Sequence, residues 1–222
     1  MEEKQIGDEL ASIRSLMERS SKFISLSGLS GILAGVYALI GAGFAYYMLY
    51  IPNEQFIIRT PPPDSAPVKG LFYGFDFNGY VASLEPRLLL IALLVFIASV
   101  STGILLTIRK AKRKGQPIWG TTSKLLLFNM ATPLAVGGIL ILIFIYRGYY
   151  GIVASTSLIF YGLSLIGAGN FTFTDVKYLG MCEIVLGLIA ACVPGYGLLF
   201  WTIGFGVLHI VYGSIMYLKY DK

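Results

Sequence analysis

Long apolar runs separated by short polar breaks occupy nearly the whole chain. A helix that crosses the hydrocarbon core of a bilayer needs about 20 mainly apolar residues. Six runs approach this length, and the fourth and fifth lie near its lower limit: about 23–50, 88–108, 125–146, 151–168, 178–193 and 198–218. The pattern predicts an all-α integral membrane protein with a bundle of six transmembrane helices, in which a Pro/Gly cluster at 194–197 turns the fifth run into the sixth.

The composition of the chain supports the same class. Of its 222 residues 56% are hydrophobic and 13% are charged, whereas soluble domains have roughly 45–50% and about 25%. A water-soluble globule and a disordered chain are therefore excluded as classes. We expect one membrane domain over 23–218 and a short cytoplasmic tail over 219–222, and we expect the lipid bilayer to be the main partner.

The distribution of basic residues predicts the orientation. If the N-terminus is cytoplasmic, the opposite side receives only four of the seventeen Lys and Arg residues: Arg59, Lys69, Arg87 and Arg147. Short cytoplasmic loops of membrane proteins carry an excess of Lys and Arg. This predicts a plasma-membrane protein, in the inner membrane if the source is bacterial, with both termini in the cytoplasm. The basic loop 109–114 is expected to meet anionic lipid headgroups, so the positive net charge requires no nucleic acid.

The first 22 residues form a segment of their own. Apolar residues recur there at helical spacing, with charged residues between them: Ile6, Leu10, Ile13 and Met17. This spacing predicts a cytoplasmic amphipathic helix over 1–22. It either lies on the lipid headgroups or contacts a partner protein.

The connection at 51–87 is the one long loop and is expected to face outward. It begins with a proline-rich stretch at 61–67, and its second half interleaves aromatic residues with glycines at 71–80. Aromatic side chains are favoured at the membrane interface. Three interpretations are open: a lid lying on the outer interface, a lid over a ligand entrance, or a docking site for an external partner.

Charged or titratable residues inside a span mark candidate functional sites because their burial in lipid is costly. Two stand out: Glu183 in the fifth run and His209 in the sixth. Counted from the turn at 194–197 they reach nearly the same depth, in the cytoplasmic third of the bilayer. Asn129 and Ser30 come to a similar level on other spans. These residues form either a substrate or proton pathway, a cofactor site, or a set of hydrogen bonds that holds helices together.

Glycines give the second signal. Gly28, Gly31 and Gly35 lie on one side of the first span, and Gly206 and Gly213 share a face of the last span with His209. Small residues allow close contact between membrane helices. These five glycines are therefore predicted to pack helices together, either within one chain or between subunits. The glycine spacing of 28–35 recurs at 180–187, by chance or as a trace of an internal repeat.

Motifs of known enzyme classes are absent from the sequence. It has no HExxH, GxSxG, P-loop, CxxC or dinucleotide-binding pattern. The single histidine rules out bis-histidine haem ligation within one chain. We therefore expect no enzymatic activity, no catalytic or metal-binding residues and no cofactor.

Two functions are favoured, and an intramembrane enzyme acting on lipid comes third, because the chain offers no paired nucleophile and base beyond Glu183 and His209 themselves. The first is a small transporter or channel-like protein with a polar centre at Glu183 and His209. The second is a membrane interaction or regulatory subunit without transport activity, in which the same residues only hold helices together. A homo-oligomer or a membrane partner protein fits either function.

Overall fold

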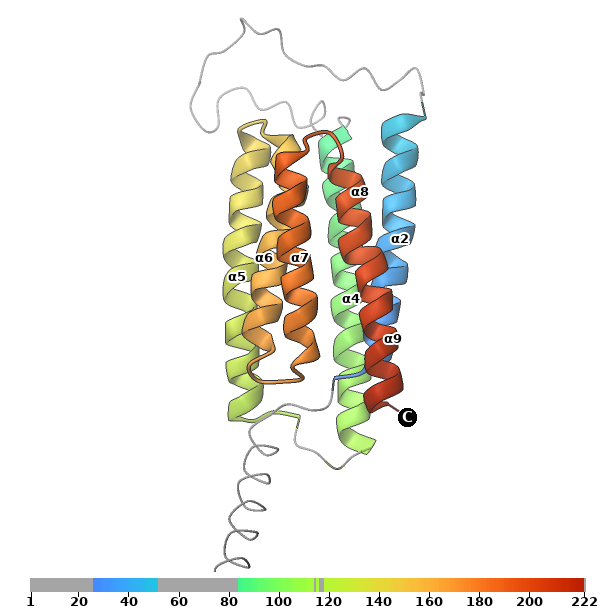
Figure 1. The fold of residues 1–222 in the computed structure, drawn as a ribbon, viewed down its shortest axis with the longest axis vertical. Coiled ribbons are helices and arrows are strands. Elements are labelled where there is room, and N and C mark those ends of the chain that lie inside the picture. The colour runs from blue at the N-terminus through green and yellow to red at the C-terminus, as the bar shows by residue number, and fades with distance from the viewer. Residues whose placement is uncertain (1–25, 52–83, 114, 116–117, 222) are drawn as a thin grey trace, which may run out of the picture.

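The structure is a computed structural model that describes residues 26–51, 84–113, 115 and 118–221 (Figure 1). Within these residues all regular structure is helical, as the sequence predicts, and six helices run nearly along one axis. The first five are α2 (Gly28–Tyr50), α4 (Leu84–Arg113), α5 (Thr121–Tyr146), α6 (Val153–Ala168) and α7 (Asp175–Cys192). The sixth consists of α8 (Gly197–Trp201), a π-helical segment η2 (Thr202–Leu208) and α9 (His209–Tyr220). A single 3-10 turn, η1 (Tyr150–Ile152), precedes α6.

Five of these helices are long and apolar enough to cross a membrane. They cover Gly28–Tyr50, Pro86–Arg113, Thr121–Tyr146, Tyr150–Ala168 and Gly197–Tyr220. The remaining helix, α7, has 18 residues, among them Asp175, Lys177 and Glu183. The chain therefore has the helices of a multi-pass membrane protein, and α7 is the helix whose composition stands apart.

Both ends of α4 differ from those expected. The helix α4 begins at Leu84 and ends at Arg113, so residues 84–87 belong to a helix rather than to the loop 51–87, and the basic stretch is helical through Arg113. Proline is tolerated in the first turn of a helix, where Pro86 lies, and basic side chains interact favourably with a helix C-terminus.

The starts of other helices also differ: α5 begins at Thr121 rather than at residue 125, and the first helix starts later than expected. The helix α2 begins at Gly28 rather than at residue 23, and Ser27 before it has an extended backbone. The expected amphipathic helix over 1–22 and most of the loop 51–87 lie outside the described residues.

The helices form two groups. In one group α2 packs against α4, η2 and α9, and in the other α6 packs against α5 and α7. The groups meet along the sixth helix, because α6 contacts α8, and α7 contacts α8, η2 and α9. Figure 1 shows α5, α6 and α7 on one side of the bundle and α2 on the other, with α8 between α7 and α2 and with α9 close to the lower part of α2. We call the contact of α6 and α7 with the sixth helix the group boundary.

In α2, small residues are buried and large apolar residues face outward. The buried residues of α2 are all glycine or alanine: Gly28, Gly35, Ala38, Gly41, Ala42 and Ala45. Large apolar side chains of the same helix are exposed, including Ile40 and Phe44. A large apolar surface of this kind is unusual for a soluble monomer, and small residues at the contacts are typical of membrane helices.

Glycines lie where the helices cross most closely. A Cβ atom added to Gly35 would lie 2.6 Å from the carbonyl oxygen of Gly206, and one added to Gly31 would lie 3.0 Å from the Cα atom of Gly213. A Cβ atom on Gly28 would collide with the backbone of Tyr217. The structure therefore places the two glycine faces named above against each other, where α2 crosses the sixth helix.

The crossing of α6 and α7 has the same form. A Cβ atom on Gly180 would lie 2.7 Å from the carbonyl oxygen of Gly162, and one on Gly187 would lie 3.0 Å from that of Ser155. The similar stretches 28–35 and 180–187 thus both supply the glycines of an antiparallel helix crossing. A shared packing requirement accounts for their similarity without a repeat.

Candidate functional site

Most polar side chains within the helices bond to the backbone of their own helix or its preceding turn. Ser155 and Thr156 donate hydrogen bonds to the carbonyl oxygen of Ile152, and Ser214 donates to that of Ile210. Such local bonds satisfy a hydroxyl group without a partner helix. Glu183 and His209 are different: both are buried, the Glu183 carboxylate has no hydrogen-bond partner, and His209 also bonds to a side chain of another helix.

The structure brings Glu183 and His209 together at the group boundary. The Nδ1 atom of His209 lies 3.5 Å from Oε1 of Glu183 and 3.0 Å from the carbonyl oxygen of Gly204. The Nε2 atom lies 2.7 Å from the hydroxyl oxygen of Tyr161. We call these four residues, Tyr161, Glu183, Gly204 and His209, the buried centre. They come from α6, α7 and the sixth helix, so the buried centre spans both helix groups.

The π-helical segment η2 shapes the buried centre. It contains Gly204 and ends immediately before His209. Such segments are rare and occur frequently at functional sites. A Cβ atom on Gly204 would lie 2.5 Å from Oε2 of Glu183 and would collide with Leu158. Glycine at this position therefore lets the Glu183 side chain approach the backbone of the sixth helix.

Aromatic rings surround the imidazole ring of His209. The ring centroids of Tyr161 and Phe205 lie 5.4 and 6.0 Å from that of His209. Phe205 also contacts Tyr161 and Trp201, at 5.0 and 5.1 Å between centroids. These rings enclose the imidazole in an apolar environment in which charge is poorly solvated.

The carboxylate of Glu183 has an incomplete set of partners. The residue is 0% exposed, and neither oxygen has a hydrogen-bond partner. An ionised carboxylate in such a place is costly unless a positive charge or hydrogen-bond donors balance it. In the buried centre that balance comes either from a proton on Glu183 itself or from a protonated His209 beside it.

The other two residues of the predicted pathway lie elsewhere. Asn129 donates a hydrogen bond to the carbonyl oxygen of Leu125 in its own helix, at 2.8 Å. Ser30 donates to the carbonyl oxygen of Ser27 at the start of α2, at 2.6 Å. The structure does not bring these two side chains to the buried centre.

Two members of the buried centre were not identified from the sequence. Tyr161 is one of fifteen tyrosines in the chain, and Gly204 is one of twenty-six glycines. Ser157, Tyr161 and Ser164 recur at helical spacing, and this polar face of the fourth run is the signal that could have found Tyr161. The short spacing of Gly204 and Gly206 before His209 is the one local feature that sets this part of the last run apart.

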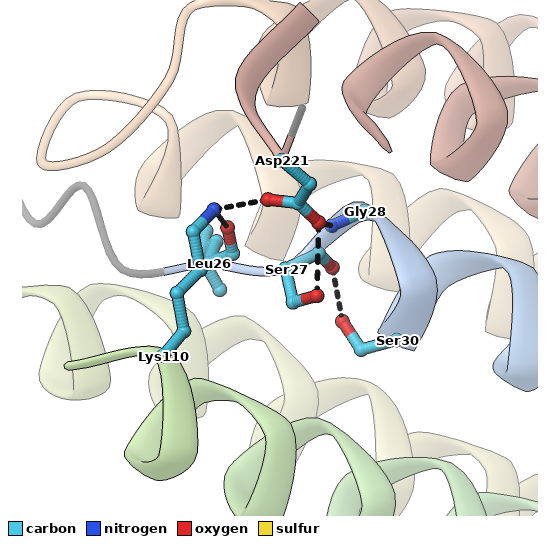
Figure 2. Close-up of polar contacts among 6 residues, drawn as sticks. All are labelled: Leu26, Ser27, Gly28, Ser30, Lys110 and Asp221. Carbon is cyan, nitrogen blue, oxygen red and sulfur yellow. Dashed lines mark hydrogen bonds and ion pairs between the residues drawn. The ribbon is translucent and has the colours of Figure 1, made fainter. Parts of the chain in front are cut away.

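A second polar cluster joins the ends of three helices (Figure 2). Asp221, directly after α9, accepts hydrogen bonds from the backbone N–H of Gly28 at 2.8 Å and from the hydroxyl of Ser27 at 3.0 Å. Lys110 of α4 forms an ion pair with Asp221 and donates to the carbonyl oxygen of Leu26 at 2.6 Å. We call these five residues, Leu26, Ser27, Gly28, Lys110 and Asp221, the end cluster.

The end cluster supplies a cap that α2 lacks locally. The side chain of Ser27 does not cap its own helix, and the Asp221 carboxylate takes that place, where a negative charge is favoured. Burial alone would raise the pKa of Asp221, but the hydrogen bonds from Lys110, Gly28 and Ser27 outweigh it and hold the pKa below its usual value. Asp221 is therefore ionised at neutral pH.

Comparison with protein-family models, with curated proteins and with solved structures finds no match to this chain. Among the described residues, no three His, Cys, Asp or Glu side chains lie close enough to hold a metal ion.

Proposed function

We propose that this protein is a non-enzymatic membrane transporter or channel-like protein, and that the buried centre is the polar site of its pathway. The observation that carries the proposal is the Glu183 carboxylate, fully buried without a hydrogen-bond partner and 3.5 Å from the only histidine in the chain. Ionisable residues inside a membrane domain are costly and are found mainly on ion and substrate pathways.

The position of the buried centre supports this proposal. Tyr161 and Glu183 belong to the group of α5, α6 and α7, whereas Gly204 and His209 belong to the helix that packs against α2. A change of charge on Glu183 or His209 therefore acts directly on the contact between the two groups. Movement of one helix group against another is a common basis of alternating access in transporters.

As part of the proposal, α7 is the sixth membrane-crossing helix. Its 18 residues give a length of about 27 Å at 1.5 Å per residue, close to the thickness of the hydrocarbon core. It packs antiparallel to α6, which is long and apolar enough to span. The charge of Glu183 faces the buried centre rather than lipid, which lowers the cost of its insertion.

The proposed orientation places the end cluster in the cytoplasm. Within the described residues, basic side chains gather at this end of the bundle: Arg109, Lys110, Lys112, Arg113, Lys124, Lys177 and Lys219. The opposite end has Arg87 and Arg147. By the positive-inside rule, the first end is cytoplasmic, in the plasma membrane or in the inner membrane of a bacterium.

The alternative is an interaction or regulatory subunit without transport activity. The observation that favours it is the complete burial of Glu183 and the near-complete burial of His209, at 0% and 5% exposed. A closed polar contact of this kind also serves to hold helices together. In that case the pair contributes to helix packing and no ion crosses the protein.

Flux in liposomes separates these two functions. The full chain and the Glu183→Gln variant are reconstituted at equal density, and ion and proton flux are measured under a pH gradient and under an applied potential. Cys182→Ser is the matched control, because Cys182 is the exposed neighbour of Glu183 on α7. We expect flux from the wild type and from Cys182→Ser, and at least a tenfold loss in Glu183→Gln. Absence of flux from the correctly folded wild type would contradict transport and support the subunit.

A further inference from the structure

We propose that the species bound at the buried centre is a proton, taken up at Nε2 of His209 through the hydroxyl of Tyr161. This inference rests on the proposed function for its role in transport, but the proton site itself is tested separately below. It assigns Tyr161 as a relay residue and Gly204 as the fixed acceptor that orients the imidazole ring.

The hydrogen bonds of His209 determine which ring nitrogen is free. The carbonyl oxygen of Gly204 only accepts hydrogen bonds, so Nδ1, 3.0 Å away, carries a hydrogen and donates it. In the neutral ring Nε2 then has a lone pair, which accepts the hydroxyl hydrogen of Tyr161 at 2.7 Å. A proton that binds to the ring therefore binds at Nε2, because Nδ1 is already protonated.

Proton uptake reverses the hydrogen bond between Tyr161 and His209. Tyr161 passes its hydroxyl proton to Nε2 and takes another from a hydronium ion, which becomes water. A new N–H bond forms at Nε2, the Tyr161 O–H bond is restored, and Nε2–H now donates to the phenolic oxygen. Release to water is the reverse of this step, so the proton balance is closed without any other reactant.

Glu183 supplies the counter-charge for the protonated ring. Its Oε1 atom lies 3.5 Å from Nδ1, and the pair of Glu183 carboxylate and His209 imidazolium is neutral as a whole. The neighbouring elements contribute the hydroxyl of Tyr161 from α6, the hydroxyl of Tyr212 from α9, which lies near Tyr161, and, from α2, Gly31, whose added Cβ atom would lie 3.5 Å from the His209 carbonyl oxygen. Among these groups, Glu183 is the only one that balances a positive charge on His209.

The buried centre fits a proton better than a metal ion or an organic cation. A metal ion needs a free nitrogen lone pair, whereas Nδ1 carries a hydrogen and Nε2 is bonded to Tyr161. The space beside the Glu183 carboxylate is also filled, since a single Cβ atom on Gly204 would lie 2.5 Å from Oε2. A proton requires neither a free site nor added volume.

The single histidine makes this inference testable without a transport assay. The full chain, labelled with nitrogen-15 histidine and reconstituted in lipid, gives signals from His209 alone. We expect a hydrogen-bearing Nδ1 and a bare Nε2 at high pH, and a protonated Nε2 at low pH, over about pH 4 to 9, a range that brackets ordinary histidine titration. A bare Nδ1 at high pH, or no titration in this range, would overturn the proposal.

Two variants test the roles of Tyr161 and Glu183. Tyr161→Phe keeps the ring and removes the hydroxyl, so we expect a changed Nε2 signal and at least a tenfold slower proton exchange. Tyr178→Phe is the matched control, because Tyr178 is exposed on α7, and it should leave both unchanged. Glu183→Gln removes the counter-charge, so Nε2 should stay bare at pH values where it is protonated in the wild type. If Tyr161→Phe and Glu183→Gln both titrate and exchange like the wild type, the proton site is wrong.

The two experiments fail independently. If liposomes show flux but His209 does not titrate, the protein remains a transporter and the inference about the proton is contradicted. If His209 titrates as described but no flux is seen, the proton site stands and the transport function is contradicted.

Discussion

The buried centre and the end cluster contain the same kinds of groups, but their carboxylates differ in hydrogen bonding. Each cluster has a carboxylate, a basic side chain, a hydroxyl group and a backbone group of a glycine. In the end cluster the Asp221 carboxylate receives hydrogen bonds from Lys110, Ser27 and Gly28. In the buried centre the hydroxyl and the backbone group bond to His209 instead, and the Glu183 carboxylate receives none.

This difference separates a structural site from one that is able to change its charge. A carboxylate that is already fully paired gains nothing from a proton, and its bonds hold α2, α4 and α9 together. A buried carboxylate without donors is stabilised by any proton or positive charge that reaches it. Hydrogen bonding, rather than residue type, therefore distinguishes the two clusters.

The largest expected effect is on the end cluster. Asp221→Asn removes the charge that pairs with Lys110 and caps α2, and the site is largely buried. We expect it to lower the free energy of unfolding by about 2 kcal/mol, measured by unfolding in detergent micelles.

A double-mutant cycle provides the control for this substitution. Lys110→Met alone should also lower the free energy of unfolding. The double variant should lose less than the sum of the two single losses, because either substitution already breaks the ion pair and the second cannot break it again. A change below about 0.5 kcal/mol in Asp221→Asn would show that the end cluster is not structural.

Lowering the pH is expected to have a smaller effect on the stability of the protein. Because the folded pKa of Asp221 lies below its usual value of about 3.9, its contribution to stability is present above about pH 4 and is lost as the pH falls through the folded pKa. The melting temperature of the wild type should approach that of Asp221→Asn as the pH is lowered. Other carboxyl groups titrate in both proteins and cancel in the difference. A constant difference down to the lowest pH would contradict this assignment.

The smallest effect on stability is expected from the matching amide substitution in the buried centre. Glu183→Gln removes no hydrogen bond, since the carboxylate has no donor, so the free energy of unfolding should change by less than about 0.5 kcal/mol. Thermal unfolding in the same detergent, beside Asp221→Asn, provides the comparison. A loss of about 2 kcal/mol or more would mean that the Glu183–His209 pair holds helices together, and the two clusters would then be alike.

The helices and their ends could be predicted from the sequence to within a few residues. Apolar run lengths are a local property, and they placed all six helices, including the Pro/Gly turn before α8. The errors came at the ends, where Leu84–Arg87 and the basic residues through Arg113 continue α4. The length of an apolar run does not predict such extensions, because the added residues are not apolar. Proline is nevertheless tolerated in the first turn of a helix, and basic residues are favoured in the last turn.

The sequence by itself determined the class of protein, the glycine faces and the equal depth of Glu183 and His209, because these depend on composition and on spacing along single helices. The tertiary structure decided which side chains meet. It selected Tyr161 from fifteen tyrosines, placed the Gly204 carbonyl oxygen beside the His209 ring, and brought Asp221 to α2, 193 positions away from Gly28 along the chain. The rotation of each helix about its axis depends on packing against its neighbours, and only the assembled bundle fixes it.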